Sequence, residues 1–318
     1  MVTGMITINH NIRLKASNFI PLAGTILVIV FFQIVCQGKL LTAKNITVLT
    51  NQIFYVLLIS LGAIFIYAHG SIDISIGGMF GIGMLVGTII TNATGSILLG
   101  FLSIMALCTL IGVLNGVLQN VFSSRPFLPT LCMMFMLRGI LSFAGNMKTF
   151  KISNEYAVYD NTVVKIVVIV VCALISLFLF NYTKIGKFNK AMGGNPIASA
   201  QLGVNLAKYK IIAFTLTGVF TGIAAFFSMV RTRSVTGLSG SGMEFNVMTA
   251  LIYGGMSLAG GAQSRFSAAI YGSIIVTVLG NGMTMSGFSP GIVALTKAII
   301  FLILVYISAE RSKGALPR

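Results

Sequence analysis

Residues 68–87 read AHGSIDISIGGMFGIGMLVG. The stretch carries one carboxylate, Asp73, and six glycines, although the chain on both sides is apolar enough to lie in lipid. A charge at the centre of a bilayer is costly, so we expect Asp73 to lie where one membrane span has ended and the next begins. There its carboxylate would cap the first amides of the following helix and form, with Ser75, Gly77 and Gly78, a structural hairpin on the inner side. The alternative is a role for Asp73 in a gate or a proton path.

The glycines of this stretch predict close helix packing. Gly77 and Gly81, and then Gly83 and Gly87, are four residues apart, which places small residues on one face of a helix. Lipid gives helices no hydrophobic reason to associate, so helices in a membrane associate through such close contacts.

The composition of the whole chain indicates a polytopic membrane protein. Hydrophobic residues make up 56% of the 318 residues, charged residues only 8%, and the mean hydropathy is +0.98. Soluble domains carry about a quarter charged residues. Many apolar runs reach the roughly 20 residues that a helix needs to cross a bilayer.

We therefore predict an all-α integral membrane fold of about ten transmembrane helices. Residues 19–308 form one transmembrane domain, between short polar tails at 1–18 and 309–318. The predicted spans are residues 19–37, 49–68, 74–91, 97–120, 127–146, 163–182, 211–230, 245–260, 267–286 and 291–308.

The net charge of +16 fits a membrane protein better than a nucleic-acid-binding protein. The Lys and Arg residues are scattered among short loops and form no stripe with interleaved aromatic residues, so we expect no nucleic acid partner. More of them fall in inner segments when both termini are cytoplasmic, which favours that orientation. The outer segments then hold three of the five acids, namely Glu155, Asp160 and Glu244.

The sequence offers no catalytic or metal site. The four cysteines lie singly inside apolar runs, and there is no Cys/His ligand spacing, paired carboxylate or Ser/His/Asp set. The phosphate-binding pattern GxxxxGK[ST] is also missing from the sequence, so any ATP and Mg²⁺ would be bound by another polypeptide. We expect a transport protein rather than an enzyme, without a cofactor in this chain.

The longest inner loop, residues 183–210, contains a short capped helix. Asn195 is suited to the N-cap and Pro196 to the first helical position, and Gly203 can end the helix in the left-handed conformation. The enclosed helix at 196–202 is only about 10 Å long, too short to cross a bilayer. It is either a surface helix on lipid headgroups or a docking helix for a cytoplasmic partner, to which Ala198 and Ala200 would offer a small face.

Four polar residues inside the predicted spans are candidates for a translocation path. A basic side chain in a span lines a path, pairs with a carbonyl or extends to the interface. A polar but weakly charged path would suit a neutral solute. The candidates are Asn115, Arg138, Asn281 and Lys297.

Four segments resemble one family of transport proteins. AMGGNPIASAQLGVN, residues 191–205, is similar to the cytoplasmic coupling segment of ribose-type permeases, the membrane subunits of bacterial ABC importers for monosaccharides. GSIDISIGG (70–78), FLPTLCMMFMLRG (127–139) and ALIYGGMSLAGGAQS (250–264) resemble further segments of that family, in the family's order. The resemblance runs from about residue 45 to 310.

The resemblance implies a type II ABC importer-like permease fold in the bacterial inner membrane. It implies a permease that works as a pair, with two cytoplasmic ABC ATPase subunits and a periplasmic sugar-binding protein as partners. The contact with the ATPase would be made by Lys187, Lys190, Gly193, Gly194, Asn195, Pro196, Ala198, Ala200 and Gly203.

The chain departs from the family pattern at a few positions that leave the identity of the sugar open. His69 stands where glycine is usual, and Met192, Met256 and Met285 replace smaller or branched residues. The cargo could be a ribose-like pentose, an inositol, a nucleoside or an autoinducer-type furanosyl ligand. An ion-coupled secondary carrier is the rival from another class, and a membrane scaffold is the weakest alternative.

Overall fold

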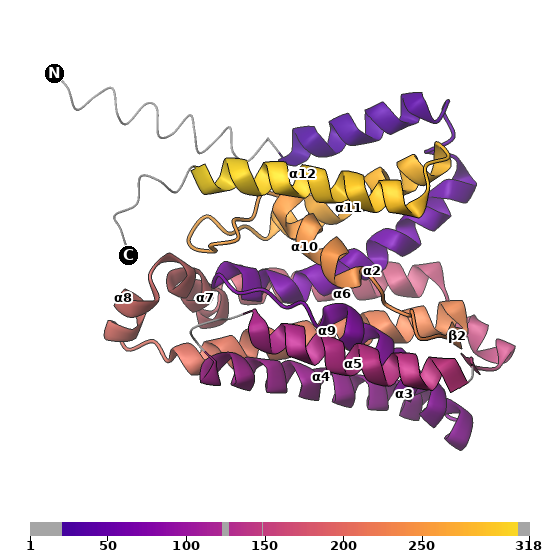
Figure 1. Ribbon diagram of the computed structural model, residues 1–318, viewed down its shortest axis with the longest axis horizontal. Helices are drawn as coiled ribbons and strands as arrows, with labels where there is room; N and C mark the ends of the chain where they lie inside the picture. Colours follow the sequence, from indigo (N-terminus) through magenta and orange to yellow (C-terminus); the bar gives the residue numbers. More distant parts are fainter. Residues whose placement is uncertain (1–20, 123–126, 148, 311–318) are drawn as a thin grey trace. The chain divides into compact units, whose positions relative to one another are not determined.

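A computed structural model describes residues 21–122, 127–147 and 149–310 (Figure 1). The predicted tail at residues 1–18, and nearly all of the tail at 309–318, lie outside the described residues. The chain divides into two compact units. The larger unit comprises Phe54–Met248 and Met256–Phe266, and the smaller unit comprises the described part of Met1–Ile53 with Thr249–Gly255 and Ser267–Arg318.

The smaller unit is built from helix Pro21–Val35, the beginning of α2 (Ala43–Ala68), α11 (Ser267–Met285) and α12 (Pro290–Glu310). Its helices pack through glycine and through buried amides. A Cβ on Gly282 would lie 2.4 Å from the Phe32 ring, so the ring of Phe32 in the first helix packs directly against the backbone of α11. Asn45 Nδ2 donates a hydrogen bond of 2.9 Å to Asn281 Oδ1 and so joins α2 to α11.

The larger unit contains most of the helices, and two short strands join its loops. Strands β1 and β2 pair antiparallel, with Phe150 opposite Val235. Its elements are the rest of α2, α3 (Ile76–Thr94), α4 (Ile97–Val121), α5 (Leu128–Met147), β1 (Phe150–Lys151), η1 (Asn154–Tyr159), α6 (Thr162–Asn181), α7 (Lys184–Gly194), α8 (Pro196–Gln201), α9 (Leu206–Thr232), β2 (Ser234–Val235) and the first half of α10 (Met243–Tyr253).

The core of this unit is the contact of α4 with α9, along which the two helices run side by side (Figure 1). Small residues permit this contact, as expected for helices that associate in lipid. A Cβ on Gly112 would lie 2.5 Å from the Phe214 carbonyl oxygen, and one on Gly218 would lie 2.4 Å from the Cys108 carbonyl oxygen.

The glycines of α3 pack closely, as predicted, but on two sides of the helix and not on one face. Gly83 and Gly87 face α4, where a Cβ on Gly87 would lie 2.4 Å from Ile104. Gly81 faces α5 and the turns of the segment 236–242, since its Cβ would lie 2.5 Å from both the Leu141 side chain and the Ser239 carbonyl oxygen.

Seven helices of the described residues are long and apolar enough to cross a membrane. They are α2, α3, α4, residues 128–145 of α5, α6, α9 and α11, and each lies on a predicted span. Helices Pro21–Val35 and Pro290–Tyr306 are apolar but shorter.

The predicted span at 245–260 is wrong. In its place lies α10, which has 11 residues and is about 16 Å long. The chain between α9 and α11 nevertheless passes from one end of the larger unit to the other. It begins at β2, beside the strand that follows α5, and it reaches the end of α2, where Gly261 N donates to Ala68 O. The segment 236–242, which precedes α10, forms a run of turns instead of a helix because it is rich in glycine and serine, and Gly240 and Gly242 have φ values of +72° and +78°.

Candidate functional site

Helices α7 and α8 lie at one end of the larger unit, beyond the ends of α4 and α9 (Figure 1). Asn195 is both the C-cap of α7 and the N-cap of α8, and its Oδ1 accepts a hydrogen bond of 3.0 Å from Ala198 N. Pro196 opens α8, and Gly203 follows it with a φ of +82°. The helix ends at Gln201, with Leu202 as its C-cap. The sequence punctuation at 195–203 therefore gives the expected capped helix, one residue shorter than predicted.

The structure separates the glycines expected at this site. Gly193 is buried, and a Cβ on it would lie 2.1 Å from the Ala68 carbonyl oxygen at the end of α2. Gly194 and Gly203 have open space around the position of a Cβ. Ala200 is exposed and Ala198 is half-buried. Packing within this chain thus restricts Gly193, while the other glycines border open space.

The two lysines expected at the site differ in their surroundings. Lys187 is exposed on α7. Lys190 lies with its Nζ 4.0 Å from the centre of the Phe180 ring and donates a hydrogen bond of 3.3 Å to Asn181 Oδ1. Burial lowers the pKa of Lys190. Lys190 therefore joins α7 to the end of α6, and Lys187 presents a free charge to the outside of the bundle.

Two apolar residues of this end were missed by the sequence reasoning. Ile197 on α8 is 72% exposed and Leu202 is 85% exposed. Large apolar side chains on a helix that is too short to enter the bilayer are a signal in the sequence itself, because such side chains otherwise lie in lipid or in a core. Together with α8, they form what we call the docking end, residues 195–203.

Asp73 lies in the extended segment between α2 and α3, and it is 2% exposed. Its Oδ1 accepts hydrogen bonds from Ser75 N at 2.8 Å and Ser75 Oγ at 2.7 Å. Ser75 is the N-cap of α3, so Asp73 orders the residue before the helix instead of capping the helix amides as expected. Asn115 on α4 donates to Ser75 Oγ at 2.7 Å. Desolvation raises the pKa of Asp73 to about 6, against the hydrogen bonds from Ser75.

Arg138 binds the turns of the segment 236–242 to α5. Its guanidinium donates to the Ser239 carbonyl oxygen at 2.9 Å and to the Gly240 carbonyl oxygen at 2.7 Å, and it lies 3.4 Å from Glu244 Oε2. A Cβ on Gly77 would lie 2.6 Å from the Gly240 carbonyl oxygen, so α3 begins against the same cluster. The position of Arg138 matches the pairing with carbonyls that was one of its predicted roles. Glu244, which the sequence analysis assigned to an outer segment, is an almost buried partner of Arg138.

The other candidate path residues also join helices. Asn115 of α4 is fully buried and donates a hydrogen bond to Ser75, and Asn281 of α11 is bound to Asn45 of α2. Lys297 lies half-buried on α12 of the smaller unit, where its carbonyl oxygen accepts a hydrogen bond of 2.9 Å from the Tyr253 hydroxyl. Of the four candidates, Asn115 and Arg138 thus belong to the larger unit, and Asn281 and Lys297 belong to the smaller unit.

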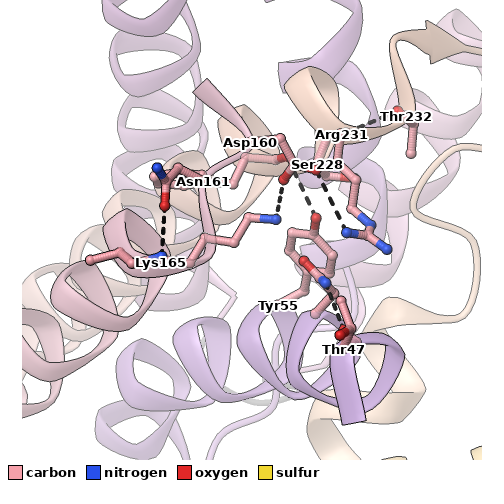
Figure 2. A network of polar contacts seen from close by, with 11 residues as sticks. Thr47, Tyr55, Asp160, Asn161, Lys165, Ser228, Arg231 and Thr232 are labelled. Carbon is pink, nitrogen blue, oxygen red and sulfur yellow. Dashed lines mark hydrogen bonds and ion pairs between the residues drawn. The ribbon is translucent and has the colours of Figure 1, made fainter. Parts of the chain in front are cut away.

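A charged network lies where α6 begins and α9 ends (Figure 2). The Asp160 carboxylate binds the buried Lys165 ammonium and lies 3.6 Å from the Arg231 guanidinium. Tyr55 of α2 lies beside them, with its hydroxyl 3.5 Å from the Phe227 carbonyl oxygen. The sequence analysis used these charges only to compare the inner with the outer segments. It could not pair them, because Arg231 is far from Asp160 along the chain. Within the described ranges, no group of three or more His, Cys, Asp or Glu side chains could hold a metal.

Comparison with known proteins places these features in a family. Residues 45–308 match the family described as "Branched-chain amino acid transport system / permease component". The ribose import permease RbsC of Escherichia coli (strain K12) is 27% identical over 284 residues, which cover 85% of this chain and 87% of that protein.

Other relatives carry the names of other sugars. The galactofuranose transporter permease YtfT of Escherichia coli (strain K12) is 28% identical over 288 residues, covering 88% of this chain and 84% of its own length. The fructose import permease FrcC of Rhizobium meliloti is 26% identical over 314 residues, with coverage of 91% and 84%. No solved structure matches the chain. With the family match extending over residues 45–308, this chain belongs to the permease components of transport systems, which are multi-pass membrane proteins and not themselves enzymes.

Proposed function

We propose that this chain is the membrane-spanning subunit of an ATP-driven importer that passes a monosaccharide across the bacterial inner membrane by alternating access. The proposal is supported by relatives that carry the names of ribose, galactofuranose and fructose permeases and that align over most of both chains. The family description names branched-chain amino acids, but these aligned relatives are sugar permeases.

The observation that carries the proposal is the docking end. A short capped helix with two exposed apolar side chains, Ile197 and Leu202, extends beyond the spanning helices. A permease that worked alone would have no use for an apolar surface at this place. In our proposal, these side chains insert into a cytoplasmic ABC ATPase subunit, and Lys187 contributes charge at the edge of the contact.

The energy comes from the partner. ATP and Mg²⁺ are bound by the ATPase subunits, and this chain supplies no cofactor site of its own. A periplasmic sugar-binding protein delivers the sugar, and a second permease subunit, identical or related, completes the path. The docking end and both termini face the cytoplasm, in agreement with the distribution of Lys and Arg along the sequence.

The ATPase drives the change of access through α7 and α8. When two ATPase subunits close on ATP, the docking end moves with them, and α7 moves with α8 because Asn195 belongs to both helices. The chain breaks at 69–75 and 236–242 are then the places where the spanning helices can change direction, since their backbone is not held in a continuous helical ladder.

Reconstitution tests this function. Proteoliposomes with this chain, its ATPase and its binding protein should accumulate labelled D-ribose, D-fructose, L-arabinose or galactofuranose only with MgATP on the ATPase side. Proteoliposomes with this chain alone should accumulate none of them. Uptake by the chain alone, driven by an ion gradient, would show a secondary carrier and overturn the proposal.

A furanosyl ligand is the second candidate for the cargo. It is favoured by the galactofuranose permease, which is 28% identical over 88% of this chain. Titration of the binding protein with galactofuranose and with ribose distinguishes the two candidates, because the tighter ligand identifies the cargo.

A further inference from the structure

The C-terminal end of α2 is closed by a tight backbone turn. Gly70 has a φ of +78°, its N–H donates to the Tyr67 carbonyl oxygen, and Ser71 N–H donates to the Ile66 carbonyl oxygen. This pair of bonds defines a Schellman motif with His69 as the C-cap residue and Gly70 after it. The end of α2 is therefore a fixed structure from which the His69 side chain projects.

Two other segments contact this end at the level of the backbone. Gly261 N donates a hydrogen bond of 2.9 Å to the Ala68 carbonyl oxygen. A Cβ on Gly193 of α7 would lie 2.1 Å from the same oxygen and 2.4 Å from Gly261 N. Helix α7, the end of α2 and the segment around Gly261 thus meet without side chains between them, all within the larger unit. We call this meeting point the α2–α7 joint, residues 68, 69, 189, 193 and 261.

A side-chain hydrogen bond completes the joint. His69 Nδ1 lies 2.9 Å from Asn189 Oδ1 and 3.0 Å from the Phe65 carbonyl oxygen. The orientation of the Asn189 amide is fixed by its Nδ2, which donates to the Ile185 carbonyl oxygen at 2.8 Å. Since both neighbours of Nδ1 are acceptors, Nδ1 carries the proton and donates. Asn189 is fully buried and His69 is almost so, which makes the bond costly to break.

The imidazole stays neutral at cellular pH. Desolvation, with the nearby Lys210 charge, lowers the pKa of His69 to about 4, although its bonds to Asn189 and Phe65 act in the opposite direction. The hydrogen bond to Asn189 is therefore made by a neutral imidazole.

The joint continues directly into the chain break at 69–75. Three residues after His69, the Ile72 carbonyl oxygen lies 3.4 Å from Thr130 Oγ1 at the start of α5. Ser75 then binds Asn115 of α4. A displacement of α7 that is transmitted to residue 69 consequently reaches contacts with both α4 and α5 within six residues.

We propose that His69 and Asn189 are positioning residues for transport, whose hydrogen bond transmits displacement of the docking end from α7 to the break between α2 and α3. This inference rests on the proposed function, because it needs an ATPase that moves the docking end. It assigns a role to the position at which this chain has His instead of the glycine usual in the resembling family.

Hydrogen exchange in the assembled complex tests the proposal. The probe is MgATP trapped with vanadate on the ATPase, and the readout is backbone exchange in residues 69–75 of the permease. In the unaltered complex, trapping should change this exchange about fivefold or more, as expected for a local opening equilibrium that is shifted through one buried contact. In His69→Phe and in Asn189→Leu, which keep the side-chain bulk and remove the bond, the change should fall below about twofold.

Two further variants separate coupling from folding. Ser176→Ala removes another buried bond to α2, from Ser176 Oγ to the Leu61 carbonyl oxygen at 2.7 Å, and should respond to nucleotide as the unaltered chain does. The double variant of His69 and Asn189 should be no worse than either single variant, because both act through one bond.

The outcomes distinguish the two proposals. If His69→Phe and Asn189→Leu co-purify with the ATPase and keep the full nucleotide response, or if their effects add in the double variant, the joint has no transmitting role. If the unaltered chain binds no ATPase, the proposed function fails, and this inference fails with it.

Discussion

At the scale of single residues, the polar side chains of the spans hold backbone that is not helical. Arg138 illustrates the principle, because its guanidinium donates to the Ser239 and Gly240 carbonyl groups in the turns of the segment 236–242. Inside a bilayer such carbonyl groups have to be satisfied by the protein. Asn115 donates instead to the side-chain hydroxyl of Ser75, the N-cap residue of α3.

Arg138→Met should destabilise the protein. The substitution keeps much of the side-chain length but removes the guanidinium that donates to the Ser239 and Gly240 carbonyl groups and pairs with the Glu244 carboxylate, a loss of about 3 kcal/mol. We expect the thermal unfolding midpoint in detergent to fall by about 6–12 °C. Glu244→Gln is the matched control, since it keeps an acceptor for Arg138, and its midpoint should fall by less. Equal midpoints for Arg138→Met and the unaltered chain would show that the cluster does not hold the segment.

Asp73 and His69 should contribute to the pH dependence of stability with opposite signs. Burial raises the pKa of Asp73 to about 6 from 3.8, so the ionised carboxylate costs stability, and this cost disappears as the pH falls from 6 to 3.8. Burial lowers the pKa of His69 to about 4 from 6.5, so His69 costs stability as the pH falls from 6.5 to 4. The two effects oppose each other in one pH window.

Thermal unfolding between pH 6.5 and pH 4.5 measures the two contributions. Relative to the unaltered chain, Asp73→Asn should lose stability more steeply on acidification, because the opposing gain from Asp73 is gone. His69→Phe should lose it less steeply or gain stability. Parallel pH profiles for all three proteins would contradict the burial of both groups.

At the scale of the elements, the sequence predicted continuous helices well and interrupted helices poorly. The capped helix α8 follows from Asn195 and Pro196 alone, because caps are local. The segment 236–242 could not be predicted in this way. The sequence places it in a loop between two predicted spans, and the residue that holds its turns in place, Arg138, is 102 residues away from Gly240. The role of Glu244 was missed for the same reason.

Two adjacent glycines of α7 should respond differently to alanine. Gly193→Ala places a methyl group against the Ala68 carbonyl oxygen, so α7 has to move away from α2, and ATP hydrolysis should be coupled less tightly to uptake. Gly194→Ala places the same methyl group in open space and should behave as the unaltered chain does. The ratio of ATP hydrolysed to sugar accumulated in proteoliposomes is the measurement. An unchanged ratio in Gly193→Ala would count against transmission through this packing.

At the scale of the whole molecule, the described helices and the family match agree on a multi-pass permease component. The predicted spans identified the seven long helices, whereas the site was only partly predictable. The sequence located the docking end through its caps, but its exposed apolar residues, Ile197 and Leu202, follow from the structure. The candidate path residues could not be grouped from the sequence, because which polar side chains meet depends on packing between distant helices.

Charge on the docking end should prevent assembly. Ile197→Asp or Leu202→Asp places a carboxylate where we propose an apolar contact, and recovery of the ATPase with the permease should fall about tenfold or more, as expected for a central contact residue. Asn205→Asp is the matched control. It adds the same charge nearby and keeps an oxygen that can accept the N-cap hydrogen bond from Lys208 N. Normal ATPase recovery with both apolar positions charged would place the contact elsewhere.

The dependence of residues 236–242 on Arg138 has a consequence for biosynthesis. Ribosomes make α5 before they make the segment 236–242, so the guanidinium that donates to the Ser239 and Gly240 carbonyl groups is already synthesised when this segment emerges. A nascent chain that lacked the arginine would not offer this donor to the two carbonyl groups at that moment. The order of the helices along the chain is thus also a workable order of insertion. Arg138, the hydrogen-bond donor, is synthesised before the segment whose carbonyl groups accept its hydrogen bonds.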